Sequence, residues 1–351
     1  MMPMAKVLVL APSRKTRGGI NSVVNAYRST GLWQEFRCKW IPTYIDRKLL
    51  LKLAFFAVAF LRCLVLMPFY DIVHIHFSLP SSAKRKFFFF RMAKFYRRKV
   101  VIHLHCGDQL PAIWSPLYQR MFSEADVAIV LSDAARKRVE SFMGHCDHLR
   151  VVYNPCPIVS HVTPYSHRQP ELLVAGTLNR NKAYQDIIPA WGRVAGEFPD
   201  WKLVFAGNGE VEAARTLAEQ NGVADRTVFL GWVDKARKDE VFNRSSALCM
   251  ASYKEGFPMA VLDAFSYGLP VISSLTGGMS DLVAADPSSV LTFTAGNVDE
   301  LADRMRRMME DPAMRERMAE ASLGFSRGQF SLDKIVGQIK EVYLSCSDEI
   351  K

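Results

Sequence analysis

Short apolar runs alternate with amphipathic stretches along most of the 351-residue chain. Runs rich in Val, Ile and Leu are typical of strands buried on both faces, and the amphipathic stretches have the period of helices. This alternation predicts parallel sheets covered by helices, an α/β fold. The predicted strands form two sets, first AKVLVLAP, DIVHIHFS, KVVIHLH, ADVAIVLS and LRVVYNP, then LLVAGT, WKLVFAG, TVFLGW, SALCMAS and LPVISS.

A proline-rich segment divides the two sets of strands. Residues 154–171, NPCPIVSHVTPYSHRQPE, show little periodicity and are predicted to be a linker. We therefore predict two doubly wound domains, 1–165 and 166–325, with the ligand in a cleft between them, beyond the carboxyl ends of the strands. Residues 326–351 hold one more amphipathic pattern, predicted as a C-terminal helix that packs back toward the N-terminal domain.

Charge and cysteine content narrow the functional classes. The net charge of +10 indicates an anionic partner. The seven cysteines are scattered without CxxC or zinc spacing, which predicts reduced thiols in a cytoplasmic protein. Residues 1–13 have a strand-like pattern without a cleavage site, so no secretory signal is expected.

The stretch YKEGFPMAVLDAFSYGLPVI, residues 253–272, predicts an anion site at a helix start. Pro258 suits the first position of a helix and Gly268 the position just past its end, which predicts a helix over 258–267. The free amides of Met259 and Ala260 and the helix dipole would then bind an anion, for which a diphosphate is the obvious candidate.

Two acids flank this predicted helix start. Glu255 precedes the helix and cannot serve the phosphate, because like charges repel, but it can accept hydrogen bonds from hydroxyl groups. Asp263 shares the helix face of Met259 and Ala260, and its side chain leans toward the helix start. The pair is predicted to bracket a nucleoside diphosphate sugar, with sugar hydroxyls at Glu255 and ribose at Asp263.

This stretch resembles the signature E-G-F-P-x-x-x-L-E-A-x-A-x-G-x-P-V-I of the retaining glycosyltransferase family 4. That family has the GT-B fold of two Rossmann-like domains. Matching positions extend over nearly the whole chain, at Gly18-Gly19-Ile20, Asp71-Ile72-Val73-His74-Ile75-His76, His105, Asn154, Gly176, Lys182, Gly207-Asn208-Gly209 and Gly277-Gly278.

The resemblance implies roles for further residues. Gly18 and Gly19 would face the donor phosphates and the acceptor, and His105 would contact the transferred sugar. Lys182, helped by Arg180 and the amides of the 258–267 helix, would stabilise the departing diphosphate. The motif residues Gly256, Phe257 and Pro258 and the turn at Gly207 would line the donor site. The N-terminal domain would bind the acceptor and the C-terminal domain the nucleotide sugar.

Three positions depart from the family pattern. Asp263 stands where the family usually has its second glutamate, which shortens the side chain by one methylene. Thr177 stands where an arginine usually holds the diphosphate, a role for which Arg180 is a candidate. Asp281 stands at the usual glutamate after the Gly-Gly turn.

No cofactor or metal is expected from the sequence. GNGE at 207–210 lacks the third glycine of a dinucleotide fingerprint. We find no Asp-x-Asp pair in a plausible metal loop and no His/Cys cluster, which favours a metal-independent enzyme. Lys182, Arg180 and the helix dipole would take the place of a cation.

Two segments predict a membrane-facing surface. Residues 84–99, KRKFFFFRMAKFYRRK, carry eight basic residues, and on a helix Phe88, Phe89 and Phe95 share a core-facing side while Phe87 and Phe90 fall toward the basic side. Mixed aromatic and basic residues suit an anionic bilayer, although single-stranded nucleic acid or a solvated basic face would have the same composition. We favour the membrane because of the segment's place in the first domain.

Residues 48–70 are more apolar still, but Lys52 and Arg62 interrupt the run and Pro68 ends it. This predicts a buried or interfacial helix rather than a membrane span.

We therefore expect a hexosyltransferase that is peripheral on the inner face of the membrane, and the family resemblance alone implies that it retains the anomeric configuration. It would move a sugar from a nucleotide sugar to a glycan or lipid-linked acceptor in cell-surface polysaccharide synthesis, and would bind no nucleic acid. A nucleotide-sugar epimerase of the same fold and a non-catalytic binding protein remain alternatives.

Overall fold

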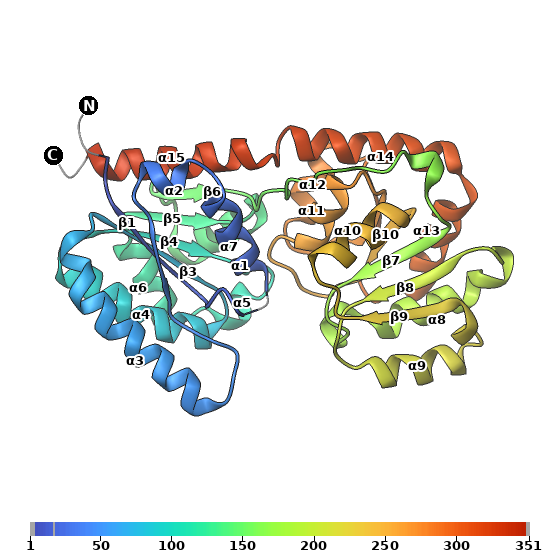
Figure 1. Ribbon diagram of the computed structural model, residues 1–351, viewed down its shortest axis with the longest axis horizontal. Coiled ribbons are helices and arrows are strands. Elements are labelled where there is room, and N and C mark those ends of the chain that lie inside the picture. Colours follow the sequence, from blue (N-terminus) through green and yellow to red (C-terminus); the bar gives the residue numbers. More distant parts are fainter. Residues whose placement is uncertain (1–3, 17, 349–351) are drawn as a thin grey trace. The chain divides into compact units, whose positions relative to one another are not determined.

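The computed structural model describes residues 4–16 and 18–348, which form two compact units (Figure 1). Unit 1 takes the chain up to Pro155 and again from Leu332 onward, and unit 2 spans Cys156–Ser331. Each unit contains one six-stranded parallel sheet with helices on both faces. This confirms the predicted α/β fold of two doubly wound domains.

The sheet of unit 1 has the order β2-β1-β3-β4-β5-β6. Apart from β6, its strands are made almost entirely of buried or half-buried residues, as expected for a sheet with both faces covered. The strands are β1 (Val7–Ala11), β2 (Lys39–Pro42), β3 (Ile72–Phe77), β4 (Lys99–Leu104), β5 (Val127–Val130) and β6 (Leu149–Val151).

Helices cover both faces of this sheet. On one face, α4 contacts β3, β4 and α6, and α3 packs beside α4; on the other, α15 contacts α1 and β3. The helices of unit 1 are α1 (Gly19–Arg28), α2 (Leu32–Glu35), α3 (Leu49–Leu66), the 3₁₀ turn η1 (Met67–Phe69), α4 (Pro80–Phe95), α5 (Leu110–Ile113), α6 (Pro116–Glu124), α7 (Asp133–Met143) and α15 (Leu332–Asp348).

The sheet of unit 2 has the order β12-β11-β10-β7-β8-β9. β8 and β9 extend the sheet on one side of β7, and β10, β11 and β12 extend it on the other side. The order therefore reverses between β7 and β10. The strands are β7 (Glu171–Ala175), β8 (Lys202–Ala206), β9 (Thr227–Gly231), β10 (Ala247–Met250), β11 (Val271–Ser274) and β12 (Val290–Phe293).

Five helices of unit 2 connect successive strands, namely α8 (Tyr184–Val194), α9 (Val211–Gln220), α10 (Lys235–Arg244), α11 (Met259–Ser266) and α12 (Met279–Ala285). The helices α13 (Val298–Glu310) and α14 (Pro312–Arg327) follow the last strand. Short 3₁₀ turns lie at η2 (Tyr165–His167), η3 (Arg180–Lys182), η4 (Ala195–Glu197) and η5 (Ala224–Arg226).

All ten predicted strands are present, and two further strands, β2 and β12, were missed. Both missed strands are four residues long and lie at an edge of their sheet. An edge strand has one neighbour and needs no long apolar run, so the hydrophobic pattern gave little signal there.

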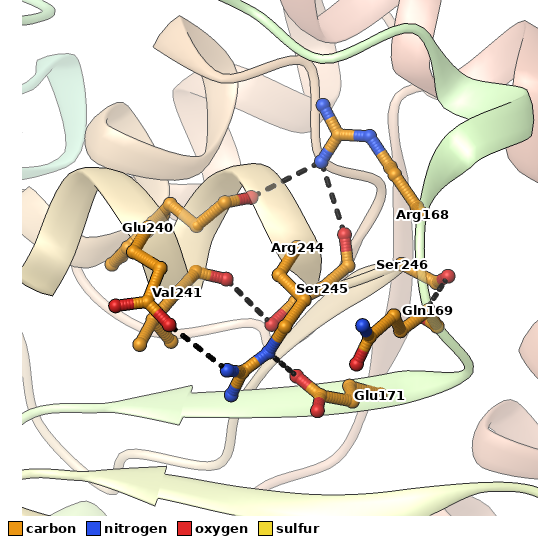
Figure 2. Close-up of polar contacts among 9 residues, drawn as sticks. Arg168, Gln169, Glu171, Glu240, Val241, Arg244, Ser245 and Ser246 are labelled. Atoms are coloured by element: carbon orange, nitrogen blue, oxygen red, sulfur yellow. Dashed lines mark hydrogen bonds and ion pairs between the residues drawn. The ribbon is translucent and has the colours of Figure 1, made fainter.

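The predicted boundary at 165/166 is about ten residues too late. Residues 156–170 belong to unit 2, because side chains and backbone groups tie them to it. Cys156 N donates to Phe330 O at 2.8 Å, and Thr163 N donates to Asn243 Oδ1 at 2.8 Å. The guanidinium of Arg168 donates to the carbonyl of Phe242 at 3.1 Å. It also donates to the carbonyl of Ser245 at 3.0 Å (Figure 2).

The C-terminal helix begins at Leu332 and lies with unit 1. In Figure 1 it is the red helix beside the blue elements of unit 1. Its Tyr343 is buried against β3 and Phe36, and its Lys340 pairs with Glu35 at 2.6 Å. The sequence boundary at 325/326 is therefore six residues early, because α14 continues to Arg327 within unit 2.

The predicted faces of the aromatic-basic helix are partly wrong. In α4, Phe89 and Phe90 are fully buried, whereas Phe88 and Phe95 are 58% and 81% exposed. Phe87 is half-buried against the core, with the Arg120 guanidinium over its ring. The reason is that α4 contacts the sheet and also α3 and α6, so its buried arc is wider and rotated from the single face expected.

Lys86, one of the eight basic residues of the 84–99 segment, is buried. Its Nζ donates to Leu10 O at 2.7 Å. Burial lowers its pKa well below the ordinary lysine value, with a smaller opposing effect from Cys63.

Candidate functional site: the strand ends of unit 2

The residues predicted for the donor site lie on loops that follow the central strands of unit 2. The loop after β7 carries Lys182, the loop after β8 carries Gly207, and the loop after β10 carries Glu255. β7 and β10 are neighbours where the strand order reverses, which is the usual ligand position in such sheets. A small pocket at this point is lined by residues including Gly176, Thr177 and Lys182.

Lys182 and Glu255, 73 residues apart in sequence, form an ion pair. Lys182 Nζ lies 2.5 Å from Glu255 Oε1, and the side chains are 31% and 13% exposed. The pair brings a cation and an acceptor of hydrogen bonds to one place. A diphosphate bound by the ammonium and sugar hydroxyls bound by the carboxylate would therefore be adjacent, as the sequence predicts.

Two hydrogen bonds hold together the loops that carry Lys182 and Glu255. Tyr253 N donates to Asn181 O at 2.8 Å, and Asn181 Nδ2 donates to Lys254 O at 3.0 Å. The Asn179 side chain accepts from Lys182 N at 3.0 Å and caps the short turn η3. The Lys182 side chain thus projects from a loop whose backbone is fixed on both sides.

Gly207 is required by the close approach of two loops. A Cβ at this position would lie 1.7 Å from Gly176 O, and one at Gly209 would lie 2.1 Å from Leu178 O. Leu178 N donates to Asn208 O at 2.7 Å across the same contact. The predicted turn is present, and its glycines let the β7 and β8 loops touch.

Gly256 and Phe257 rest on the turn after β11. Gly278 N donates to Gly256 O at 2.9 Å, and a Cβ on Gly278 would lie 2.1 Å from the Phe257 ring. Gly277 has φ +57° and packs against Glu255 O. The Gly-Gly turn therefore supports the backbone that carries the predicted sugar-binding acid.

Helix α11 spans Met259–Ser266, one residue shorter at each end than predicted. Pro258 is the N-cap, with extended backbone (ψ 112°), rather than the first helical residue. Gly268 has φ +62° and follows the helix end as predicted, with Leu269 N bonded to Ala264 O and Gly268 N to Phe265 O. Met259 and Ala260 occupy the first two helical positions, where amides have no carbonyl within the helix to bond.

Asp263 is paired with a lysine that the sequence did not indicate. Its Oδ1 lies 2.5 Å from Lys238 Nζ on α10, and its side chain is 16% exposed. Burial raises the pKa of this carboxyl, and Lys238 acts in the opposite direction. The pair was missed because Lys238 lies on another helix, in a charged stretch without a motif.

Arg180, the candidate replacement for the missing arginine, is exposed in η3, two residues before Lys182. Thr177 is exposed on the same loop, next to Gly176 with φ +142°. Asp281 is in the first turn of α12, the helix that follows the Gly277-Gly278 turn. Of the three departures from the family pattern, Thr177 lies on the loop after β7, and Asp263 and Asp281 lie on α11 and α12, the helices that follow the loops after β10 and β11.

In unit 1, Gly18 caps α1 with φ +142° and Gly19 is the first residue of that helix. Asn21 Nδ2 donates to Ser13 O at 2.5 Å, which fixes the loop after β1 against the helix. The sequence also placed positive charge on this loop at Arg14, Lys15 and Arg17. Arg14 lies over the Trp40 ring, and Arg17 lies outside the described residues.

His105 follows β4 and is half-buried. Its Nε2 lies 2.9 Å from His76 Nδ1, and burial lowers its pKa to about 3. The ring is therefore neutral at physiological pH. The sequence resemblance gave His105 a contact with sugar, and a neutral imidazole with one N–H can make that contact.

The expectation that no histidine cluster exists is wrong. His74, His76 and His103 lie side by side on β3 and β4, with candidate ligand atoms all within 4.8 Å of one another. The spacing in HIH and HLH puts alternate residues on one sheet face, and the β3–β4 register then brings the two strands' histidines together. The register is a tertiary feature that the sequence pattern did not supply.

The two units are doubly wound, and a lysine and a glutamate form an ion pair at the strand ends of the second unit. Residues 6–158 match the family Glycosyltransferase Family 4, and residues 161–323 match the family Glycosyl transferases group 1. The two matches together cover most of the chain, and the chain therefore belongs to the glycosyltransferases that combine these two domains.

Curated relatives and solved structures agree with this family. N-acetyl-alpha-D-glucosaminyl L-malate synthase of Bacillus anthracis is 23% identical, over 78% of this chain and 74% of that protein. Lipopolysaccharide 1,6-galactosyltransferase of Salmonella typhimurium is 27% identical, over 53% of each. The Anabaena protein HepE, solved with UDP and glucose, superposes with a TM-score of 0.77 at 19% identity, over 97% of this chain and 100% of that chain. The superposition on HepE confirms the GT-B fold.

Proposed function

We propose that this protein transfers a sugar from a nucleoside diphosphate sugar to a hydroxyl group of a glycan or lipid-linked acceptor, with retention of the anomeric configuration. The observation that carries the proposal is the Lys182–Glu255 pair at the strand ends of unit 2, 2.5 Å apart. A uridine nucleotide is the donor we propose, since the Anabaena neighbour was solved with UDP and with UDP-glucose.

In the proposed reaction, Lys182 binds the diphosphate and stabilises the negative charge that grows as the sugar–phosphate bond breaks. The amides of Met259 and Ala260 and the guanidinium of Arg180 add to this charge stabilisation. Glu255 accepts hydrogen bonds from the sugar hydroxyls and orients the sugar.

Asp263 is proposed to hold the ribose. Lys238 fixes the carboxylate through Oδ1, which leaves Oδ2 as the oxygen that would accept a ribose hydroxyl. In unit 1, His105 and the Gly18-Gly19 turn would contact the sugar and acceptor, and no metal ion is required at the diphosphate.

The experiment is a donor and acceptor screen with anomeric analysis. UDP-glucose, UDP-galactose and UDP-N-acetylglucosamine would be incubated with the full chain, with and without a lipid-linked saccharide acceptor, and the product linkage determined by proton NMR. Acceptor-dependent UDP release with a retained anomer is expected. Donor conversion without acceptor would instead identify an epimerase, an inverted anomer would exclude retention, and a lack of binding to every nucleotide would identify a non-catalytic protein.

We further propose that unit 1 binds the inner face of an anionic membrane through α3 and α4. Among the described residues, one helix, Leu49–Phe69, is long and apolar enough by composition to cross a membrane. One side of α3 packs on the protein, because Phe56 and Phe60 contact the core of unit 1. Its other side is exposed at Leu50 (80%), Leu61 (61%) and neighbouring apolar residues.

A helix held to a domain on one side and apolar on the other is typical of an interfacial helix rather than a span. The exposed Phe88 and Phe95 of α4 extend the apolar surface, and the exposed basic residues Arg62 and Arg91 lie on the same two helices. Apolar and basic residues together favour anionic lipid over a purely apolar partner. Cell-surface polysaccharide synthesis from cytoplasmic donors is the setting we propose for such an enzyme.

A further inference from the structure

Four histidine rings stack on one face of the sheet of unit 1. His74 and His76 come from β3, His103 comes from β4, and His105 follows it. His76 is directly opposite His103 in the strand register, and the ring centroids of His74 and His76 are 4.2 Å apart. This face is covered by α15, whose Tyr343 contacts His74.

Several buried nitrogens of these histidines lack a hydrogen-bond partner. His74, His76 and His103 are 0% exposed. Among residues 4–16 and 18–348, no hydrogen-bond partner is found for Nε2 of His74, Nε2 of His76 or either nitrogen of His103. Buried polar atoms without partners are costly, and so many in one place indicate a bound ion or water.

The two hydrogen bonds that are present leave lone pairs where a metal could use them. His74 Nδ1 lies 2.7 Å from the Tyr343 hydroxyl, and His76 Nδ1 lies 2.9 Å from His105 Nε2. If each Nδ1–H donates, Nε2 of both rings carries a lone pair. Histidine ligands of metals usually have this arrangement, with the second nitrogen held by a partner outside the coordination sphere.

We propose that His74, His76 and His103 bind one divalent transition-metal ion, with zinc the best match to three neutral imidazoles. Their candidate ligand atoms lie within 4.8 Å of one another. The rings are stacked, so they must turn until their nitrogen lone pairs meet at one ion, with zinc–nitrogen bonds of about 2.0–2.1 Å. The ion links β3 to β4 in the interior of unit 1. This site is separate from the diphosphate site proposed on unit 2 and does not depend on it.

The ion also affects His105. With His76 bound through Nε2, its Nδ1–H donates to His105 Nε2, which leaves the remaining hydrogen of His105 on Nδ1. The ion thereby selects the tautomer in which His105 is a hydrogen-bond donor through Nδ1. His74, His76 and His103 act as metal ligands, and Tyr343 acts as a positioning residue.

The test measures metal content of the full chain, produced without a histidine tag in zinc-supplemented medium and purified without chelators. We expect about one zinc per chain by plasma mass spectrometry, because residues 4–16 and 18–348 contain one such group of three histidines. His103→Gln should lower the zinc content at least tenfold, whereas His161→Gln, which changes an exposed histidine of unit 2, should leave it unchanged. Circular dichroism would verify that each variant is folded.

Two further measurements keep the test decisive if His103→Gln does not fold. X-ray absorption of the zinc-loaded wild type should show three imidazole nitrogens in the first shell. Tyr343→Phe, which removes only the hydroxyl bonded to His74, should weaken zinc affinity by about tenfold. Zinc content far below one per chain, a first shell without imidazole, or equal zinc loss in His161→Gln would overturn the proposal.

Discussion

The Lys182 ammonium carries the largest share of the proposed chemistry. Replacing Lys182 with alanine removes the cation beside Glu255 and leaves the diphosphate to Arg180 and the helix amides. We expect sugar transfer to fall by about 10²–10³-fold, the usual loss for removing one group that stabilises developing charge. Initial rates of UDP release, measured with the donor found in the screen, would test this.

Lys254 provides a matched control for that substitution. It is exposed on the same loop as Glu255, and only its backbone carbonyl is bonded to Asn181. Lys254→Ala should retain most of the activity. If both lysine variants lost activity equally, a general effect of loop charge would explain the result better than a specific role for Lys182.

Gly207 illustrates a residue whose importance is steric. Gly207→Ala places a Cβ 1.7 Å from Gly176 O, so the β7 and β8 loops must separate. We expect a loss of about 1–3 kcal/mol in the free energy of unfolding, as for other overpacked sites. Thermal or urea unfolding measures this, with Gly196→Ala as the control because nothing lies within 4 Å of its added Cβ. Equal stability of the two variants would contradict the close contact.

The interactions of Asp126 predict that the stability of the protein depends on pH. Burial alone would raise the pKa of this carboxyl, but the Val100 amide at 2.8 Å and the ammonium groups of Lys94 and Lys99 outweigh it, and the pKa is lowered. The pKa of this carboxyl is lower in the folded than in the unfolded protein. The charged carboxylate therefore stabilises the fold at pH values above the ordinary pKa of 3.8, and this stabilisation is lost as the pH falls through the folded pKa.

Asp126→Asn should therefore lower the free energy of unfolding by about 1.5–3 kcal/mol at neutral pH, the range for hydrogen bonds to charged groups. The difference from wild type should shrink once the pH falls below 3.8. Urea titrations at several pH values measure it, and the exposed Asp200→Asn should show no comparable effect. A difference that stays constant with pH would argue against the charged interactions as its cause.

At the scale of elements, α3 is the feature least like a soluble surface helix. Replacing Leu50, Leu53 and Leu61 with glutamine changes three exposed side chains without opening the core. Since a fully buried leucine contributes about 1.5–3 kcal/mol, we expect at least a tenfold loss of binding to anionic lipid vesicles. Sedimentation with vesicles of phosphatidylglycerol and phosphatidylcholine measures the loss.

Ile158 provides the control for this surface, because it is 76% exposed but belongs to unit 2. Ile158→Gln should bind vesicles as wild type does, and binding of wild type should weaken at high salt. If wild type ignored vesicles and instead formed dimers that the triple substitution dissociates, the partner of α3 would be a second copy of the chain rather than lipid.

At the scale of the whole molecule, unit 2 is inserted in the sequence between two segments of unit 1. Among the described residues, helix α15 is the part of unit 1 that follows unit 2, and its Ile335, Ile339 and Tyr343 are buried. A chain ending at Ser331 should therefore lose stability in unit 1 while unit 2 still binds UDP. Calorimetry of this shortened chain should show a lower unfolding temperature for unit 1. Addition of UDP should raise the unfolding temperature of unit 2, since binding stabilises only the unit that binds. Equal destabilisation of both transitions would contradict this independence.

The strands with long apolar runs were predicted correctly, because a strand that is buried on both faces is almost continuously apolar in sequence. β1, β3 and β4 lie where the pattern put them, whereas β2 and β12 at the sheet edges did not show in it. The faces of α4 were mispredicted because contacts with α3 and α6 widened its buried arc, and no periodicity in α4 itself reports those neighbours.

Sequence alone determined the class of fold, the family and the residue types at the donor site, since strand patterns and the motif around Glu255 are local. Tertiary structure decided which groups meet. The pairing of Asp263 with Lys238, the loop contact at Gly207 and the histidine group of β3 and β4 each join residues that are distant in the chain or on different strands. Strand register and helix packing set those distances, and neither is a property of any one segment.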